Sequence, residues 1–132
     1  MKDKLIEYIV SLQLKNGGFT CSSLYSGISL STKFQQSHIV FTYSAVNSLK
    51  ILGALDKVDK KLILKNIGNH QKEDGSFSSF ENSTECDLRF VYSALSICRI
   101  FEDFSFVNTE KSKQYIDSCY NFDGGYGLRP NN

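Results

Sequence analysis

A cation, several carboxylates and an aromatic side chain lie close together in residues 74–92 of this chain. Arg89 follows Asp87 by two positions, and Glu85 and Asp74 are further acids that an ion pair could use. Tyr92 follows Arg89 by three positions, so in a helix the two side chains share one face. The cluster can therefore be a structural ion pair, or it can present a cation and a phenol to a ligand.

Four cysteines are the other candidates for chemistry. No two of them have the C-x-x-C spacing, and the N-terminal segment lacks the continuous apolar stretch of a signal peptide. We expect free thiols that act as small apolar core residues in a reduced, cytoplasmic protein. No apolar run approaches the roughly 20 residues of a membrane span, so stable membrane insertion is not expected. These cysteines are Cys21, Cys86, Cys98 and Cys119.

Composition limits the class of protein. The 132 residues carry 15 basic and 14 acidic side chains, for a formal charge of +1, which argues against a nucleic-acid-binding surface. With 41% hydrophobic and 22% charged residues, the chain is expected to fold rather than remain disordered. One proline and long periodic segments favour an all-α fold, and 10 Phe and 7 Tyr suggest an aromatic-lined cavity or interface.

The hydrophobic pattern predicts five helices and a long loop at residues 20–37. Segments 3–14, 59–71 and 109–120 are amphipathic, whereas 38–52 and 87–102 are apolar on most faces and should be buried on several sides. We expect Gly53 to end the second helix, Asp87 to favour the positive end of the fourth and Thr109 to cap the fifth.

An internal repeat organises these helices. Three glycine turns at residues 13–19, 71–77 and 119–126 each lead to an aromatic residue, and residues 38–46 align with 87–95 at a spacing of 49. Each unit is then an outer helix, a turn and an inner helix, and such units must stack to bury both faces. The pattern predicts a curved or closed double layer, of which residues 1–132 form one arc that looks cut at both ends.

The repeat resembles the β subunits of protein prenyltransferases. Gln71–Phe77, the segment beginning at Asp87 and the segment Ser37–Gly53 carry the resemblance, in order and with the right spacings. It implies an α/α toroid, here a partial arc, that works as a heterodimer with a helical-repeat α subunit. It also implies a zinc-dependent transfer of an isoprenoid from its diphosphate to a cysteine near the C-terminus of a protein substrate.

Details within the repeat favour one subtype. Phe90 looks like the geranylgeranyl enzymes rather than the farnesyltransferases. Tyr92 and the loop beginning at Cys21 look like the type I geranylgeranyltransferase, whereas Asn121–Pro130 looks more like the Rab-modifying type. We expect a type I β subunit. The alternatives are a Rab-type or farnesyl-type β subunit, a terpene-cyclase-like protein and a non-catalytic helical-repeat interaction module.

The resemblance also implies roles for individual residues. Arg89 and Tyr92 match positions that contact the isoprenoid, with Arg89 also near the peptide C-terminus. The resemblance implies that four further positions form a pocket for the last side chain of the protein substrate. At one of them, Val40 is bulkier than the alanine that the family would have. These are His38, Val40, Phe41 and Phe90.

A zinc-like motif occurs out of place. Asp117-Ser-Cys119-Tyr-Asn-Phe resembles the family's zinc motif, but it ends an outer helix instead of beginning an inner one. We therefore expect no metal ligand there, and we expect His70, in an outer helix, to be solvated. The sequence ends at Asn132, before the segments that resemble the diphosphate and zinc sites, so this chain alone is expected to contain no catalytic residue and to show no catalysis.

Overall fold

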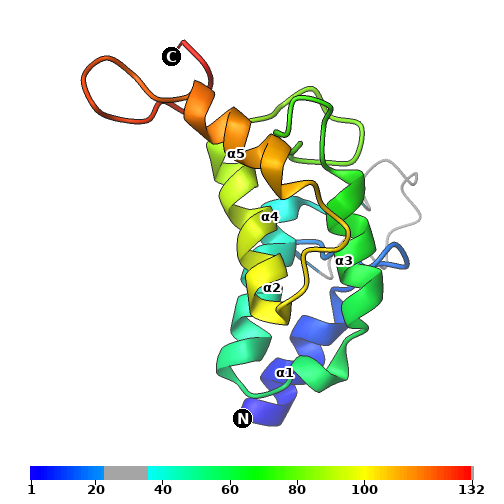
Figure 1. The fold of residues 1–132 in the computed structure, drawn as a ribbon. Coiled ribbons are helices and arrows are strands. Elements are labelled where there is room, and N and C mark those ends of the chain that lie inside the picture. The colour runs from blue at the N-terminus through cyan, green and yellow to red at the C-terminus, as the bar shows by residue number, and fades with distance from the viewer. Residues whose placement is uncertain (23–35, 132) are drawn as a thin grey trace.

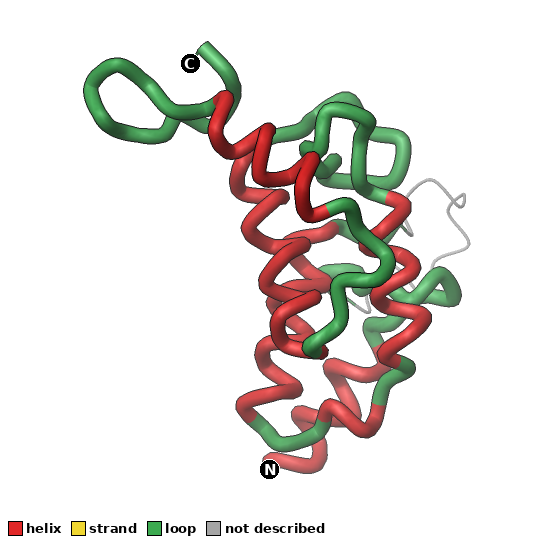
Figure 2. Tube along the Cα trace, viewed as in Figure 1, coloured by secondary structure: helices red, strands yellow, loops and turns green. Residues whose placement is uncertain are grey.

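The computed structural model describes residues 1–22 and 36–131, and most of the loop expected at 20–37 lies outside these residues. Five α-helices and one short 3-10 helix make up the described fold, and no strand occurs in this part of the chain (Figures 1 and 2). The all-α prediction is confirmed. The helices are α1 (Lys2–Ser11), α2 (Ile39–Ile51), η3 (Leu55–Lys57), α3 (Lys60–Asn69), α4 (Leu88–Phe101) and α5 (Thr109–Ser118).

Side-chain caps fix where the helices begin. Asp59 accepts a hydrogen bond from the amide of Leu62, and Asp87 accepts one from the amide of Arg89. The predicted cap of α5 is wrong by one residue. Asn108 is the cap, because its side chain accepts from the amide of Lys111, and Thr109 is the first helical residue. At the C-terminal end of α2, Gly53 has φ +69° directly after the C-cap Leu52, as predicted.

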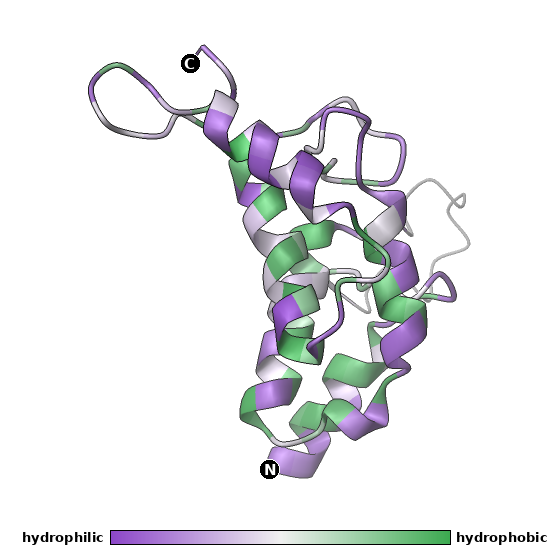
Figure 3. Ribbon diagram, viewed as in Figure 1, coloured by the Kyte–Doolittle hydropathy of each residue, from purple (hydrophilic) through white to green (hydrophobic). Residues whose placement is uncertain are grey.

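The helices form two layers. Helices α2 and α4 pack side by side, α1 packs on α2 and α3 packs on α4 (Figure 1). Hydrophilic residues cover much of the visible surface of α3 and α5, as Figure 3 shows. The largest fully buried side chains come from both layers and from the turns that join them: Phe19, Ile39, Val46, Leu49, Ile63, Leu64, Ile67, Phe77, Val91 and Ile97.

The three predicted turns share one backbone design. Each contains a glycine at φ +92°, +88° or +85°, a conformation in which a side chain would be strained. Each also has an Asn or Asp side chain that accepts the amide two residues later, at 3.1, 2.9 and 3.0 Å. A single antiparallel bridge closes each turn, between Gln13 and Phe19, Gln71 and Phe77, and Tyr120 and Tyr126.

Two expectations about individual side chains are wrong. His70 is fully buried, because the last turn of α3 brings its ring inward, where Nδ1 lies 2.9 Å from the carbonyl oxygen of Ser78. Cys21 is exposed, because it lies beyond the first turn and not in a helix. Cys98 and Cys119 are buried as predicted, and burial raises the pKa of the Cys98 thiol to about 11.

Candidate functional site

All six residues that the sequence predicted for ligand binding line one groove. The groove has a volume of about 790 Å³ and is formed mainly by the first turns of α2 and α4. The two helix starts are equivalent positions of the repeat, because His38 and Asp87 are 49 residues apart. The lining residues are His38, Val40, Phe41, Tyr43, Ser44, Glu85, Leu88, Arg89, Phe90, Tyr92, Ser93 and Leu128.

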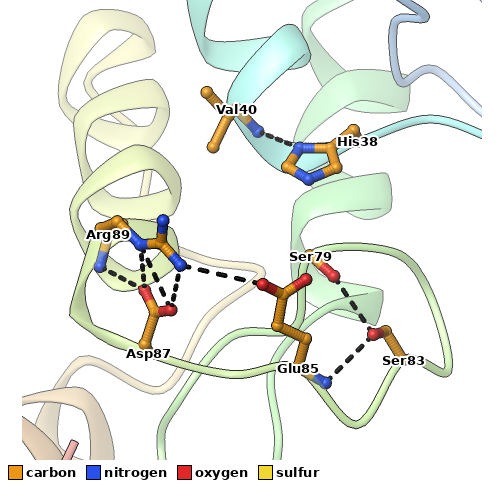
Figure 4. Close-up of polar contacts among 7 residues, drawn as sticks. All are labelled: His38, Val40, Ser79, Ser83, Glu85, Asp87 and Arg89. Atoms are coloured by element: carbon orange, nitrogen blue, oxygen red, sulfur yellow. Dashed lines mark hydrogen bonds and ion pairs between the residues drawn. The ribbon is translucent and has the colours of Figure 1, made fainter. Parts of the chain in front are cut away.

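His38 is fixed at the start of α2. Its Nδ1 accepts a hydrogen bond of 3.1 Å from the amide of Val40 (Figure 4), so the neutral ring carries its proton on Nε2. The ring centroid lies 4.8 Å from those of Phe41 and Phe80 and 5.8 Å from that of Phe90. Burial among these rings lowers the pKa of His38, although nearby Glu85 opposes the shift. The site therefore presents a neutral imidazole within an aromatic wall.

Arg89 is held by two carboxylates. Its Nη2 lies 2.7 Å from Oδ2 of Asp87, its Nε donates to both oxygens of that carboxylate, and Nη2 lies 3.8 Å from Glu85 (Figure 4). Asp87 is buried, which by itself raises its pKa, but the hydrogen bonds from the Arg89 side chain and amide hold the pKa below its usual value. The ion pair between Arg89 and Asp87 that the sequence allowed is therefore present. The Arg89 side chain is nevertheless 58% exposed in the groove.

A pair of tyrosines continues the wall along the inner layer. The hydroxyl oxygens of Tyr43 and Tyr92 lie 3.5 Å apart, and the ring centroids are 5.7 Å apart in an edge-to-face arrangement. The hydrogen bond between them raises the pKa of Tyr43. Sequence reasoning assigned Tyr92 to the site and missed Tyr43, although the 49-residue spacing that relates the two was the available signal.

Two residues for which the sequence gave no site role also contribute, Phe80 by contact with His38 and Leu128 by lining the groove. Phe80 packs edge-on against His38, and its segment forms a single bridge to it. Leu128 reaches the groove because its carbonyl accepts the amide of Leu88 at 2.9 Å, which ties the segment after the third turn to the start of α4. No motif marked Leu128, since this contact joins segments 40 residues apart.

Comparison with known proteins identifies the fold of this site. A family model described as the prenyltransferase alpha-alpha toroid domain matches residues 1–132. The chain belongs to this family. A solved structure, Candida albicans protein geranylgeranyltransferase-I complexed with GGPP, matches 99% of this toroid chain and 41% of its own with a TM-score of 0.86. Since the two are 18% identical, that match shows the fold, and the predicted α/α toroid architecture is confirmed.

Curated relatives place this toroid chain among prenyltransferase β subunits. It is 41% identical over 99 residues to geranylgeranyl transferase type-1 subunit beta of Arabidopsis thaliana, covering 74% of this chain and 26% of that protein. It is 40% identical over 98 residues to the type-2 subunit beta of Saccharomyces cerevisiae, covering 72% and 30%. The chain thus spans less than a third of the length of these two relatives, which belong to two different subtypes.

The described part of this toroid chain offers no metal site. Residues 1–22 and 36–131 contain no group of three His, Cys, Asp or Glu side chains that could hold a metal ion. In the zinc-like motif, Asp117 is exposed while Cys119 is fully buried as the C-cap of α5, so the two do not form a shared ligand set. The described residues therefore do not fit the zinc that the resemblance implies.

Hydropathy adds one further observation about this toroid chain. Within residues 1–22 and 36–131, every helix is too short or too polar to cross a membrane.

Proposed function

We propose that this chain is part of the β subunit of a protein geranylgeranyltransferase of type I. In this proposal the whole enzyme contains an α subunit and transfers an isoprenoid from its diphosphate to a cysteine near the C-terminus of a protein substrate in the cytoplasm. The carrying observation is that one groove combines an aromatic wall with a single fixed guanidinium. The type-1 β subunit relative, at 41% identity over 99 residues, supports the subtype.

The groove has the two properties that an isoprenoid diphosphate or its product requires. An apolar wall formed by Phe41, Tyr43 and Tyr92 can bury prenyl carbons, at about 25 cal/mol for each Å² removed from water. Arg89 can bind an anionic group, either the diphosphate or the C-terminal carboxylate of a peptide, by charge-assisted hydrogen bonds. Asp87 and Glu85 orient the guanidinium in advance, so less side-chain entropy is lost when the anion binds.

The pocket around His38 would receive the last side chain of the protein substrate. The ring is fixed by its own helix cap, and Phe41 and Phe90 pack against it, so the pocket is rigid and apolar. Val40 also lines this groove and reduces its space relative to an alanine. This favours a leucine-sized or smaller terminal side chain. None of these residues makes or breaks a bond, and we assign the chemical step to parts of the enzyme outside this chain.

Isoprenoid binding tests the proposal directly. We expect the chain to bind geranylgeranyl diphosphate in a calorimetric titration, and Tyr92→Ala and Arg89→Gln to weaken binding about tenfold each, which corresponds to about 1.4 kcal/mol. Lys65→Gln, an exposed change on α3, is the matched control and should bind as the parent chain does. Absence of binding by the parent chain would favour an interaction module instead.

A Rab-type β subunit is the second candidate. The type-2 relative is nearly as similar as the type-1 relative, with 40% against 41% identity. The two candidates differ in substrate, because the type I enzyme recognises a short C-terminal peptide. We expect a peptide that ends in cysteine, two apolar residues and leucine to bind in the groove once the isoprenoid is bound. Failure of this peptide, with isoprenoid binding retained, would favour the Rab type.

A further inference from the structure

Two polar side chains lie on the buried face of α3. Asn66 is 1% exposed and His70 is 0% exposed. Asn66 belongs to the last turn of α3, and His70 is the C-cap, with a right-handed helical backbone. Because the two residues are four positions apart, their side chains lie one above the other on the same face of the helix. A polar pair is therefore shielded from solvent, apart from the residues that line the groove around His38.

Three atoms of this pair make no hydrogen bond within the fold. Nδ2 and Oδ1 of Asn66 and Nε2 of His70 have no partner among residues 1–22 and 36–131. A buried polar atom without a partner is unfavourable, because it has given up its hydrogen bonds to bulk water and gained none in return. These atoms therefore need a partner that can reach them inside the protein.

The tautomer of His70 defines what its free nitrogen needs. Nδ1 lies 2.9 Å from the carbonyl oxygen of Ser78, which can only accept, so Nδ1 carries the proton. In the neutral ring Nε2 is then an acceptor with a free lone pair. Burial lowers the pKa of His70, which keeps the ring neutral near pH 7. Nε2 therefore requires a hydrogen-bond donor.

Asn66 offers groups of both kinds. Its Nδ2 has two protons to donate, and its Oδ1 accepts. A Cβ on Gly18 would lie 2.7 Å from Oδ1 of Asn66 and 2.5 Å from Oγ of Ser37, so the amide of Asn66 lies beside the first turn. Ser37 is itself buried, and its Oγ accepts a hydrogen bond of 3.1 Å from Nδ2 of Asn16. The polar pair is therefore located where α3 meets the first turn.

The equivalent pair in the next unit satisfies itself. Tyr115 and Cys119 of α5 follow the two α3 residues by 49 positions, and both are buried. The thiol of Cys119 and the side chain of Tyr115 are hydrogen-bonded to each other. Asn66 and His70 make no such direct bond. The same place in the repeat thus holds a complete pair in α5 and a pair that needs a third molecule in α3.

Burial and chemistry together indicate what that molecule is. It must fit beside two side chains that solvent does not reach, and it must donate to Nε2 of His70 while it accepts from Nδ2 of Asn66. Water has this size and both properties, and inside globular proteins it typically makes about three hydrogen bonds to buried polar groups. The described residues contain no group of three His, Cys, Asp or Glu that would favour a metal ion instead.

We infer that Asn66 and His70 form an internal water-binding site, in which a water molecule bridges Nδ2 of Asn66 and Nε2 of His70. The water donates to the imidazole and accepts from the amide, so it completes the pair as the direct bond does in α5. The site connects the end of α3 to the first turn and lies next to Ser37, the residue before His38. It supports the fold behind the ligand groove and takes no part in the proposed reaction.

Water–protein cross-relaxation in NMR spectra of the 132-residue chain tests this inference. We expect cross-peaks from water to the carbon-bound Hε1 of His70, which lies beside Nε2, and to the Nδ2 protons of Asn66. Their signs should be opposite in laboratory-frame and rotating-frame spectra, which distinguishes a bound water from surface water. The ¹⁵N shifts of His70 should show a protonated Nδ1 and an unprotonated Nε2 that accepts a hydrogen bond.

Variants identify the partners of the water. Asn66→Leu removes the donor with little change in side-chain size, and we expect the cross-peak between water and His70 to disappear. Tyr115→Phe, at the equivalent position of α5, is the matched control and should keep both cross-peaks. Circular dichroism checks that each variant folds. If Asn66→Leu loses its helical signal, His70→Phe is the second variant, and the cross-peak between water and Asn66 should disappear.

Three results would overturn the inference. One is a parent chain in which neither Asn66 nor His70 shows a cross-peak with bound water. Another is a scalar coupling between Nδ2 of Asn66 and Nε2 of His70, because it would show that the two side chains bond directly. The third is a folded Asn66→Leu chain that keeps the cross-peak at His70, because Nε2 would then have another partner.

Discussion

The second and third turns have nearly the same backbone but very different surroundings. Phe77 is completely buried and Gly75 packs against the backbone of α5, whereas Tyr126 is 57% exposed and the space beside Gly124 is open. Figure 1 shows the third turn extending away from the helices at the C-terminal end. Local sequence therefore specifies the shape of a turn, while its energetic importance depends on whether another unit packs on it.

The largest expected difference concerns the aromatic residue of each turn. Phe77→Ala should lower the free energy of unfolding by about 3–5 kcal/mol, because it removes a large side chain from a closed core. Tyr126→Ala should cost less than about 1 kcal/mol, because the side chain is 57% exposed. Urea denaturation followed by circular dichroism measures both. Equal losses would mean that the third turn is as well covered as the second.

The turn glycines provide a second comparison. Gly124→Ala should cost about 1–2 kcal/mol, because a side chain must adopt positive φ there. Gly75→Ala has the same strain and, in addition, a collision with the Lys111 backbone, which adds about 1–3 kcal/mol of overpacking. The same denaturation assay applies to both variants. Indistinguishable stabilities would contradict the close approach of the second turn to α5.

Gln71 offers a third comparison between the turns. Its side chain accepts the amide of Asn108 at 2.8 Å and donates to the carbonyl of Asn108 at 2.9 Å and to the hydroxyl of Ser112 at 3.0 Å. Gln71→Ala should cost about 1.5–3 kcal/mol, because it removes three bonds of about 0.5–1 kcal/mol each, the lower part of the typical range, since two of them are exposed. Tyr120→Ala, at the equivalent position of the third turn, should change stability by about 0.5 kcal/mol or less. Thermal unfolding ranks the two.

The smallest expected effect is a dependence on pH around the second turn. Burial lowers the pKa of His70, whose Nε2 has no hydrogen-bond partner among the residues that the structure describes. The unfolded chain takes up a proton near pH 6.5 and the folded chain only at lower pH, so this contribution to stability is lost as pH falls from about 7. His70→Gln should therefore reduce the slope of unfolding free energy between pH 7.5 and 5.5. An unchanged slope would assign the acid sensitivity to other groups, such as His38.

Most of the local structure could be predicted from the sequence. Helix positions followed from the spacing of apolar residues, and the three turns from an Asn-Gly or Asp-Gly step whose glycine permits positive φ. The site residues could be grouped because the resemblance to prenyltransferase β subunits implied their roles, and the 49-residue repeat relates the two segments that carry them. Tyr43 and Leu128 were missed for different reasons. Tyr43 could have been found, because it is the repeat equivalent of Tyr92. Leu128 could not, because it reaches the groove through a tertiary contact with Leu88 that no local pattern encodes.

The sequence by itself determined the elements, their repeat and the chemical types that line the inner layer, because these depend on periodicity and on residue identity. Only the tertiary structure decided which equivalent residues are buried. His70 is buried at the end of α3, where the sequence pattern predicted exposure to solvent. Phe41 and Phe90 occupy equivalent positions of the repeat, but they are 37% and 3% exposed. The physical reason is that burial depends on the neighbouring unit, and residues at the two ends of the arc have a neighbour on one side while those between the units have neighbours on both.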